Sequence, residues 1–108
     1  MTLVDAGPLV ALLSSGDGRH EICQAAVRTI RGPLVTVWPV LTEILHLLRA
    51  SWDAQDAVWD MMEHGRLTLL SLDVGDVPRM RELMRKYRDL PMDMADAALV
   101  TVAEREGI

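Results

Sequence analysis

The strongest constraint on the fold of this chain is the alternation of short apolar runs with longer segments of helical periodicity. The runs lie at residues 3–4, 34–38 and 67–72, and none of them contains a charged residue. Strands that are apolar throughout are typical of a parallel sheet covered by helices on both faces. The sequence therefore predicts an α/β fold, with ligands bound at the carboxyl ends of the strands.

The segments between these runs predict six helices, several of which have recognisable ends. Pro8 and Pro39 favour helix starts, since proline suits the first helical turn. Asp17 and Ser51 are predicted N-caps, and Gly65 is expected to close a helix. The expected helices cover approximately residues 9–13, 19–31, 39–50, 51–64, 76–88 and 90–107. In the second helix, the apolar face is expected to comprise Ile22, Ala25, Ala26 and Ile30.

Length and composition predict one small globular domain that spans residues 1–108, with 50% hydrophobic residues. A single cysteine, Cys23, suits a reducing cytoplasm and makes a Cys/His zinc site improbable. The sequence has no apolar stretch of membrane-spanning length and no visible signal peptide. We therefore expect a cytoplasmic protein that has no membrane partner.

The net charge of −5 argues against a basic nucleic-acid coat. A polyanion would have to meet a local basic patch or be bridged by metal. The basic residues are concentrated in one predicted helix, at Arg79, Arg81, Arg85, Lys86 and Arg88. Their spacing favours a solvated helix face, and the alternative is that they attract RNA phosphates.

Four acidic residues are expected at the carboxyl edge of the sheet. Asp5 follows the first apolar run and Glu43 lies in the helix after the second, at the edge of an apolar arc that includes Leu47. Asp93 and Asp96 begin the last predicted helix. Each also has a simpler interpretation: Asp5 as a turn or cap residue, Glu43 as a first-turn glutamate, and Asp93 with Asp96 as a capping box.

Taken together, these acids predict a divalent cation, because clustered carboxylates resist ionising together. A ligand set made only of oxygen favours Mg²⁺ or Mn²⁺ over zinc. No Ser/His/Asp or Cys/His arrangement competes with this site, and no glycine-rich phosphate loop is present. A burial cost is also expected for Asp5, directly after a buried strand, unless it is paired.

Three segments resemble the successive motifs of PIN-domain ribonucleases. Within that family, the resemblance is strongest to the VapC-type toxins of bacterial toxin–antitoxin pairs. They are VDAGPLVALL at 4–13, LTEILHLL at 41–48 and MDMADAALVTVAER at 92–105. The resemblance implies a three-layer α/β/α fold and endonuclease activity on RNA that depends on Mg²⁺ or Mn²⁺. It also implies a homodimer held inactive by a cognate antitoxin protein.

By the same resemblance, the first, second and third family acids match Asp5, Glu43 and Asp96, and Asp93 matches an auxiliary acid. The family's fourth acid, in a T-x-D segment on a further strand, has no counterpart before Ile108. We therefore expect a single PIN-like domain that lacks its C-terminal strand. The competing interpretation is a catalytically impaired PIN-like interaction module; a small-molecule enzyme that uses Mg²⁺ is a weaker alternative.

The predicted helix at 51–64 has a wide apolar surface. Ala54, Ala57 and Val58 share one face, and Trp52 and Trp59 lie on an adjacent sector. We expect the tryptophans to join a dimer or antitoxin surface; plain core packing is the alternative.

Overall fold

Three parallel strands form one sheet in the computed structural model, which describes residues 1–14, 16 and 18–108. The strands are β1 (Thr2–Leu3), β2 (Leu34–Val37) and β3 (Leu67–Leu70), and β2 lies between the other two. In the register of the sheet, Leu34 faces Thr2 on one side and Leu67 on the other. The prediction of an α/β fold with a parallel sheet is confirmed.

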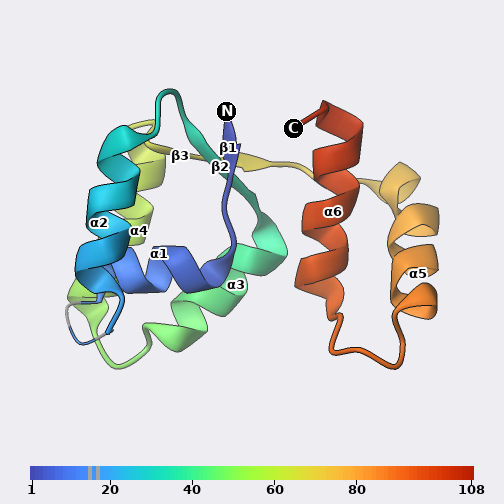
Figure 1. Cartoon of the computed structure of the whole chain (residues 1–108), viewed down its shortest axis with the longest axis horizontal. Helices are drawn as coiled ribbons and strands as arrows, with labels where there is room; N and C mark the ends of the chain where they lie inside the picture. The colour runs from blue at the N-terminus through green and yellow to red at the C-terminus, as the bar shows by residue number, and fades with distance from the viewer. Residues whose placement is uncertain (15, 17) are drawn as a thin grey trace.

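Helices cover both sides of this sheet. In chain order they are α1 (Ala6–Leu13), α2 (His20–Thr29), α3 (Trp38–Leu47), α4 (Trp52–Glu63), the short 3₁₀ helix η1 (Val74–Asp76), α5 (Val77–Lys86) and α6 (Met94–Glu106). The helices α2 and α4 lie on one side of the strands, and α5 and α6 lie on the other (Figure 1). Since α4 packs against β3 and α6 packs against β2, the molecule has the three layers that the resemblance implied.

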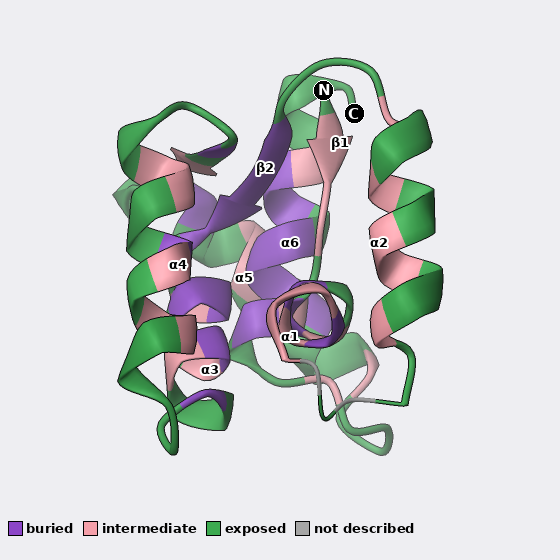
Figure 2. Cartoon of the chain, turned by 90° about the vertical axis from the view of Figure 1, so that its left-hand side faces the viewer, coloured by how far each residue is buried: buried purple, intermediate pink, exposed green. Residues whose placement is uncertain are grey.

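The core is centred on β2, all four residues of which are buried. Helix α6 supplies small side chains to it, including Ala97, Ala98 and Val102, which lets the helix approach the sheet closely (Figure 2). The one polar residue of β2, Thr36, is fully buried, and its Oγ1 donates a hydrogen bond to the Val4 carbonyl at 2.8 Å. This bond satisfies the buried hydroxyl and also ties the chain after β1 to β2.

Most helix ends agree with the prediction. The Ser51 hydroxyl accepts a hydrogen bond from the Ala54 amide at 3.2 Å, and Gly65 after α4 has a φ of +72°. Gly107 ends α6 with a φ of +69°. The predicted N-cap Asp17 lies outside the described residues. Within the described part of the chain, no helix is long and apolar enough to cross a membrane.

The predicted apolar face of α2 is wrong for three of its four residues. Ile22 is 71% exposed, and Ala25 and Ala26 are also exposed, whereas Ile30 is half-buried and packs against the core. The half-buried side chains within the helix are those of His20, Cys23, Gln24 and Val27. Helix α2 contains no fully buried residue and packs mainly against α1 at the edge of the molecule (Figure 2). Its orientation is thus set by a single neighbouring helix, which the apolar pattern of α2 does not encode.

Two further side chains are more exposed than the sequence indicated. The strand predicted to end at Trp38 ends at Val37, and Trp38 begins α3 with 54% of its surface exposed. Leu47, which we expected on the apolar arc of α3, is 50% exposed because the helix is buried through Leu41, Ile44 and Leu48. Trp38 is no longer enclosed by the core because the chain leaves the strand direction there and Pro39 continues the helix.

Candidate functional site

The first candidate acid, Asp5, is the N-cap of α1. Its Oδ1 accepts a hydrogen bond from the Ala6 amide at 2.7 Å, so the simpler interpretation as a cap is correct in structural terms. The side chain is exposed, and the burial cost that we expected for it is therefore wrong. The strand before it ends two residues earlier, at Leu3, which lets Asp5 lie outside the sheet.

Asp93 and Asp96 form a capping box at the start of α6. Asp93 Oδ1 accepts a hydrogen bond from the Asp96 amide at 2.9 Å, and Asp96 Oδ2 accepts one from the Asp93 amide at 3.2 Å. Asp93 is exposed and Asp96 is half-buried, as their positions on the helix indicated. The box fixes both carboxylates relative to the helix N-terminus, which also favours negative charge.

Glu43 lies half-buried on α3, as predicted. Burial raises the pKa of Glu43, and the negative charges of Asp93, Asp5 and Asp96 raise it further. Burial is also the largest factor that raises the pKa of Asp96; the charges of Asp93 and Asp5 add to it, and the hydrogen bond from the Asp93 amide opposes it. Asp5, Glu43, Asp93 and Asp96 are therefore close enough to repel one another, and we call them the carboxylate cluster.

The carboxylate cluster has the donor chemistry that Mg²⁺ or Mn²⁺ requires, with only oxygen atoms and an excess of negative charge. A cation there would relieve the repulsion that raises the pKa values of Glu43 and Asp96. Among the residues that the structure describes, no three His, Cys, Asp or Glu side chains are arranged to hold one ion. The cluster thus provides the ligand types for a metal, and its side chains would have to move closer together to bind it.

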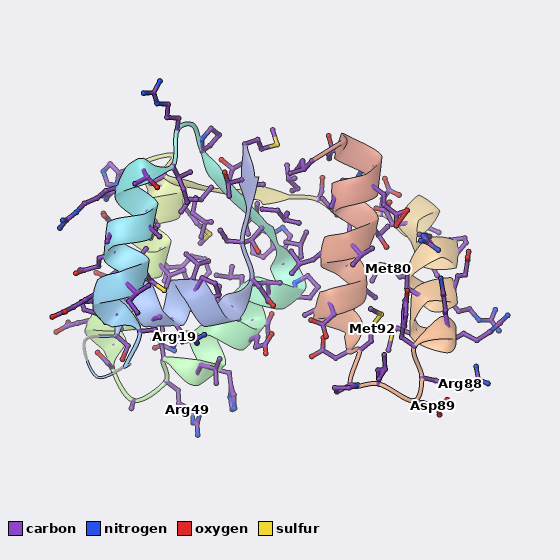
Figure 3. The ribbon with its side chains drawn as sticks, viewed as in Figure 1. Arg19, Arg49, Met80, Arg88, Asp89 and Met92 are labelled. Atoms are coloured by element: carbon purple, nitrogen blue, oxygen red, sulfur yellow. The ribbon has the colours of Figure 1, made fainter. Side chains whose placement is uncertain are left out.

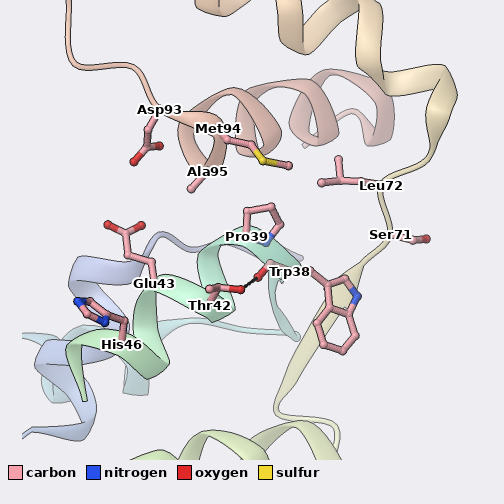
Figure 4. Close-up of a pocket in the computed structure, with 10 residues that line it drawn as sticks. All are labelled: Trp38, Pro39, Thr42, Glu43, His46, Ser71, Leu72, Asp93, Met94 and Ala95. Carbon is pink, nitrogen blue, oxygen red and sulfur yellow. Dashed lines mark hydrogen bonds between the residues drawn. The ribbon is translucent and has the colours of Figure 1, made fainter. Parts of the chain in front are cut away.

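A groove of about 840 Å³ extends from the cluster along α3. Its lining residues come from α3, from the chain after β3 and from the start of α6: Trp38, Pro39, Thr42, Glu43, His46, Ser71, Leu72, Asp93, Met94 and Ala95. Glu43 and Asp93 point toward each other at one end, and the Trp38 indole lies at the other end near Leu72 (Figure 4). The groove therefore joins an acidic end to an apolar end.

Sequence reasoning missed several of these lining residues. His46 is three residues after Glu43, and helix spacing places the two on neighbouring positions of one surface. Ser71 directly follows β3, at the carboxyl end of a strand, where ligands of parallel sheets bind. The position of Trp38 in the groove could not be predicted in this way, because its place in the sequence indicates the last residue of a buried strand.

The basic run lies away from this groove, on α5 at the far side of α6 (Figure 1). Arg79 bonds to Glu82 and Glu104, at 3.0 Å each, and Arg88 lies at the turn after α5 (Figure 3). This placement supports the interpretation of the run as a solvated helix face.

The chain belongs to the PIN domain family, since the model of that family matches residues 2–108. Among solved structures, the chain is similar to VapC20 of Mycobacterium tuberculosis, which is described as a toxin that cleaves the sarcin–ricin loop. The TM-score is 0.90 at 21% sequence identity, over 100% of this chain and 85% of that one. A search of curated proteins found no match. The predicted PIN-domain fold is confirmed.

Proposed function

We propose that this chain is a metal-dependent endoribonuclease, the toxin of a bacterial toxin–antitoxin pair, that acts on cytoplasmic RNA. The observation that carries the proposal is the carboxylate cluster, which gathers acids from the starts of α1 and α6 and from α3; burial and the neighbouring carboxylates raise the pKa values of Glu43 and Asp96. The family membership and the likeness to a toxin that cleaves RNA support the substrate class.

Asp5, Glu43 and Asp96 would hold Mg²⁺ or Mn²⁺, with Asp93 as an auxiliary ligand. A divalent cation in such a site supplies an activated water and stabilises the charge on the scissile phosphate. Helix-cap hydrogen bonds order three of these carboxylates, and binding one ion would still require the side chains to move closer together. Half-burial of Glu43 strengthens its attraction to a cation.

The alternative is a PIN-like module that binds a partner without cutting RNA. The observation that favours it is the absence, among the described residues, of any three ligands arranged around one ion. The two proposals differ in metal binding: a nuclease should bind Mn²⁺ through Asp5 and Asp96, and a module without a working site should not.

The test of the proposed function is RNA cleavage in Mg²⁺ or Mn²⁺ by the wild type and by Asp5→Asn and Asp96→Asn. We expect cleavage by the wild type and loss of cleavage in both variants. Equal activity in all three proteins would show that a contaminant or a different site is responsible.

We also propose that the toxin forms a homodimer and binds a cognate antitoxin. Trp52 and Trp59 on α4 support an interface role, because both side chains are exposed and plain core packing does not explain them. Unchanged dimerisation and antitoxin affinity in Trp52→Ala and Trp59→Ala would contradict it.

A further inference from the structure

We infer that the exposed indole of Trp38 stacks on an unpaired base of the RNA and so holds the neighbouring phosphate at the carboxylate cluster. The inference rests on the proposed function and adds to it a residue that holds the substrate, Trp38, through an unpaired base. It begins from the position of Trp38, which is 54% exposed at the first residue of α3 although the strand before it is completely buried.

The groove places this indole on a continuous path to the acids. Trp38 and Glu43 both line it, five residues apart on one helix, which corresponds to about 7.5 Å along the helix axis. Pro39 and Met94 line the space between the two ends (Figure 4). An RNA strand that lies along the groove with a phosphate near Glu43 would therefore bring one of its bases to Trp38 (Figure 4).

The charges of the groove favour stacking over phosphate contacts as the means of holding the strand. None of its lining residues is an arginine or a lysine, and two of them, Glu43 and Asp93, are acids. His46 is the only lining residue whose side chain could attract a phosphate, and it lies beside Glu43 (Figure 4), so the apolar end offers a polyanion no charge to bind. The apolar end has to hold the substrate through its bases, and every base has a π-face that an aromatic ring can cover.

Local bonding keeps the start of α3 rigid, which suits a stacking surface. The Thr42 hydroxyl donates a hydrogen bond to the Trp38 carbonyl at 3.2 Å, within the first turns of the helix (Figure 4). Pro39 fixes the backbone directly after the tryptophan. A base that binds there finds the indole on an ordered helix end, and little entropy is lost in ordering it.

Paired bases cannot stack on a side chain unless the duplex opens, because their faces already contact their neighbours. The groove should therefore accept loops, bulges and single strands. A second copy of the chain or another protein that covers Trp38 is the competing occupant, and the experiments below separate it from RNA.

The first experiment is steady-state cleavage of single-stranded RNA by Trp38→Ala, Trp38→Phe and Leu47→Ala. Leu47 is the control because it lies on the same helix, is 50% exposed and does not line the groove. We expect Trp38→Ala to raise KM about 5- to 150-fold, the range for the loss of one stacked base, with a smaller change in kcat. Trp38→Phe should recover most of the loss, and Leu47→Ala should have the wild-type KM.

The second experiment uses the double variant Trp52→Phe/Trp59→Phe. Of the three tryptophans of the chain, this variant retains only Trp38. On rapid mixing with a random-sequence single-stranded RNA in Mn²⁺, its emission should be quenched, and the same amount of duplex RNA should quench it much less. Sedimentation of Trp38→Ala should give the wild-type mass.

An unchanged KM in Trp38→Ala, or RNA binding without quenching, would overturn the inference. A lower mass for Trp38→Ala would also overturn it, because the indole would then be a contact between copies. In each of these cases the proposed function stands as long as the wild type cleaves RNA and the variants Asp5→Asn and Asp96→Asn do not. If the wild type itself does not cleave RNA, the proposed function is wrong, and the inference about Trp38 loses its basis.

Discussion

Two Asp-x-x-Asp sequences in this chain form the same local structure in opposite electrostatic environments. Asp93–Asp96 begins α6, and Asp73–Asp76 begins η1, each as a capping box with reciprocal side-chain bonds. In the second box, the Gly75 amide donates to Asp73 Oδ1 at 2.7 Å and the Asp73 amide donates to Asp76 Oδ2 at 3.0 Å.

The two boxes differ in what faces their second aspartate. Asp76 is buried and bonds to the Arg105 guanidinium, which also donates to the Ser71 carbonyl at 2.8 Å. The bond from the Asp73 amide, together with Arg105, lowers the pKa of Asp76 despite its burial. Asp96 lies among other carboxylates instead: burial raises its pKa, and the charges of Asp93 and Asp5 raise it further. A paired aspartate stabilises the fold, whereas an aspartate among like charges is available for a cation.

The largest expected difference between the two boxes is in catalysis. Asp96→Asn should lower the rate of RNA cleavage by about 100-fold or more, because a ligand of the proposed cation is lost. Asp76→Asn should keep the wild-type rate per folded molecule, measured in Mn²⁺ at a temperature where the variant is folded. A similar loss in both variants would show that the boxes do not differ in function.

The second difference is in the response to metal. At a concentration a hundred times its Kd, Mn²⁺ should stabilise the wild type by about 2.7 kcal/mol, which raises Tm by roughly 10 °C or more. Asp76→Asn should show the same increase, and Asp96→Asn a much smaller one. Thermal unfolding with and without Mn²⁺ measures this, with EDTA as the control. An equal increase in all three proteins would place the metal elsewhere.

The third difference is in thermal stability without metal, where Asp76→Asn should be the less stable of the two variants. Asp76→Asn should lower Tm by several degrees at pH 7, because the ion pair that ties η1 to α6 loses its charge. Asp96→Asn should match or exceed the wild type, since asparagine still accepts the capping bond and one repelling charge is removed. A Tm below that of the wild type for Asp96→Asn would mean that the cluster is not under repulsion.

The smallest effect is the pH dependence of these differences. The pKa of Asp76 is lowered on folding, so its stabilisation is present above the ordinary value of 3.8 and is lost as the pH falls through the folded pKa. The pKa of Asp96 is raised on folding, so its contribution is present below 3.8 and is lost as the pH rises through the folded pKa. Tm measured against pH should therefore show the Asp76→Asn deficit growing as the pH rises toward 3.8. The Asp96→Asn advantage should grow above 3.8.

Much of the fold, and the region of the site, could be predicted because they depend on short-range chemistry. Ser51, Gly65 and Asp93 mark helix ends through bonds to the backbone within a few residues, and those bonds form in the structure. Apolar strands separated by helices indicated the parallel sheet, whose carboxyl edge gathers Asp5 and Glu43. The metal-ligand roles of the four acids stay predictions, which the variants above test.

The sequence by itself determined the order and approximate positions of the helices and strands, because caps, prolines and apolar periodicity act through neighbouring residues. Only the tertiary structure decided which side of α2 is buried, that Trp38 is exposed in a groove, and which Asp-x-x-Asp pair lies among other carboxylates. Arg105 is 29 residues from Asp76, and α6 must fold back along the sheet before they meet. Burial and charge depend on such long-range neighbours, and therefore two similar local motifs have second aspartates whose pKa values shift in opposite directions.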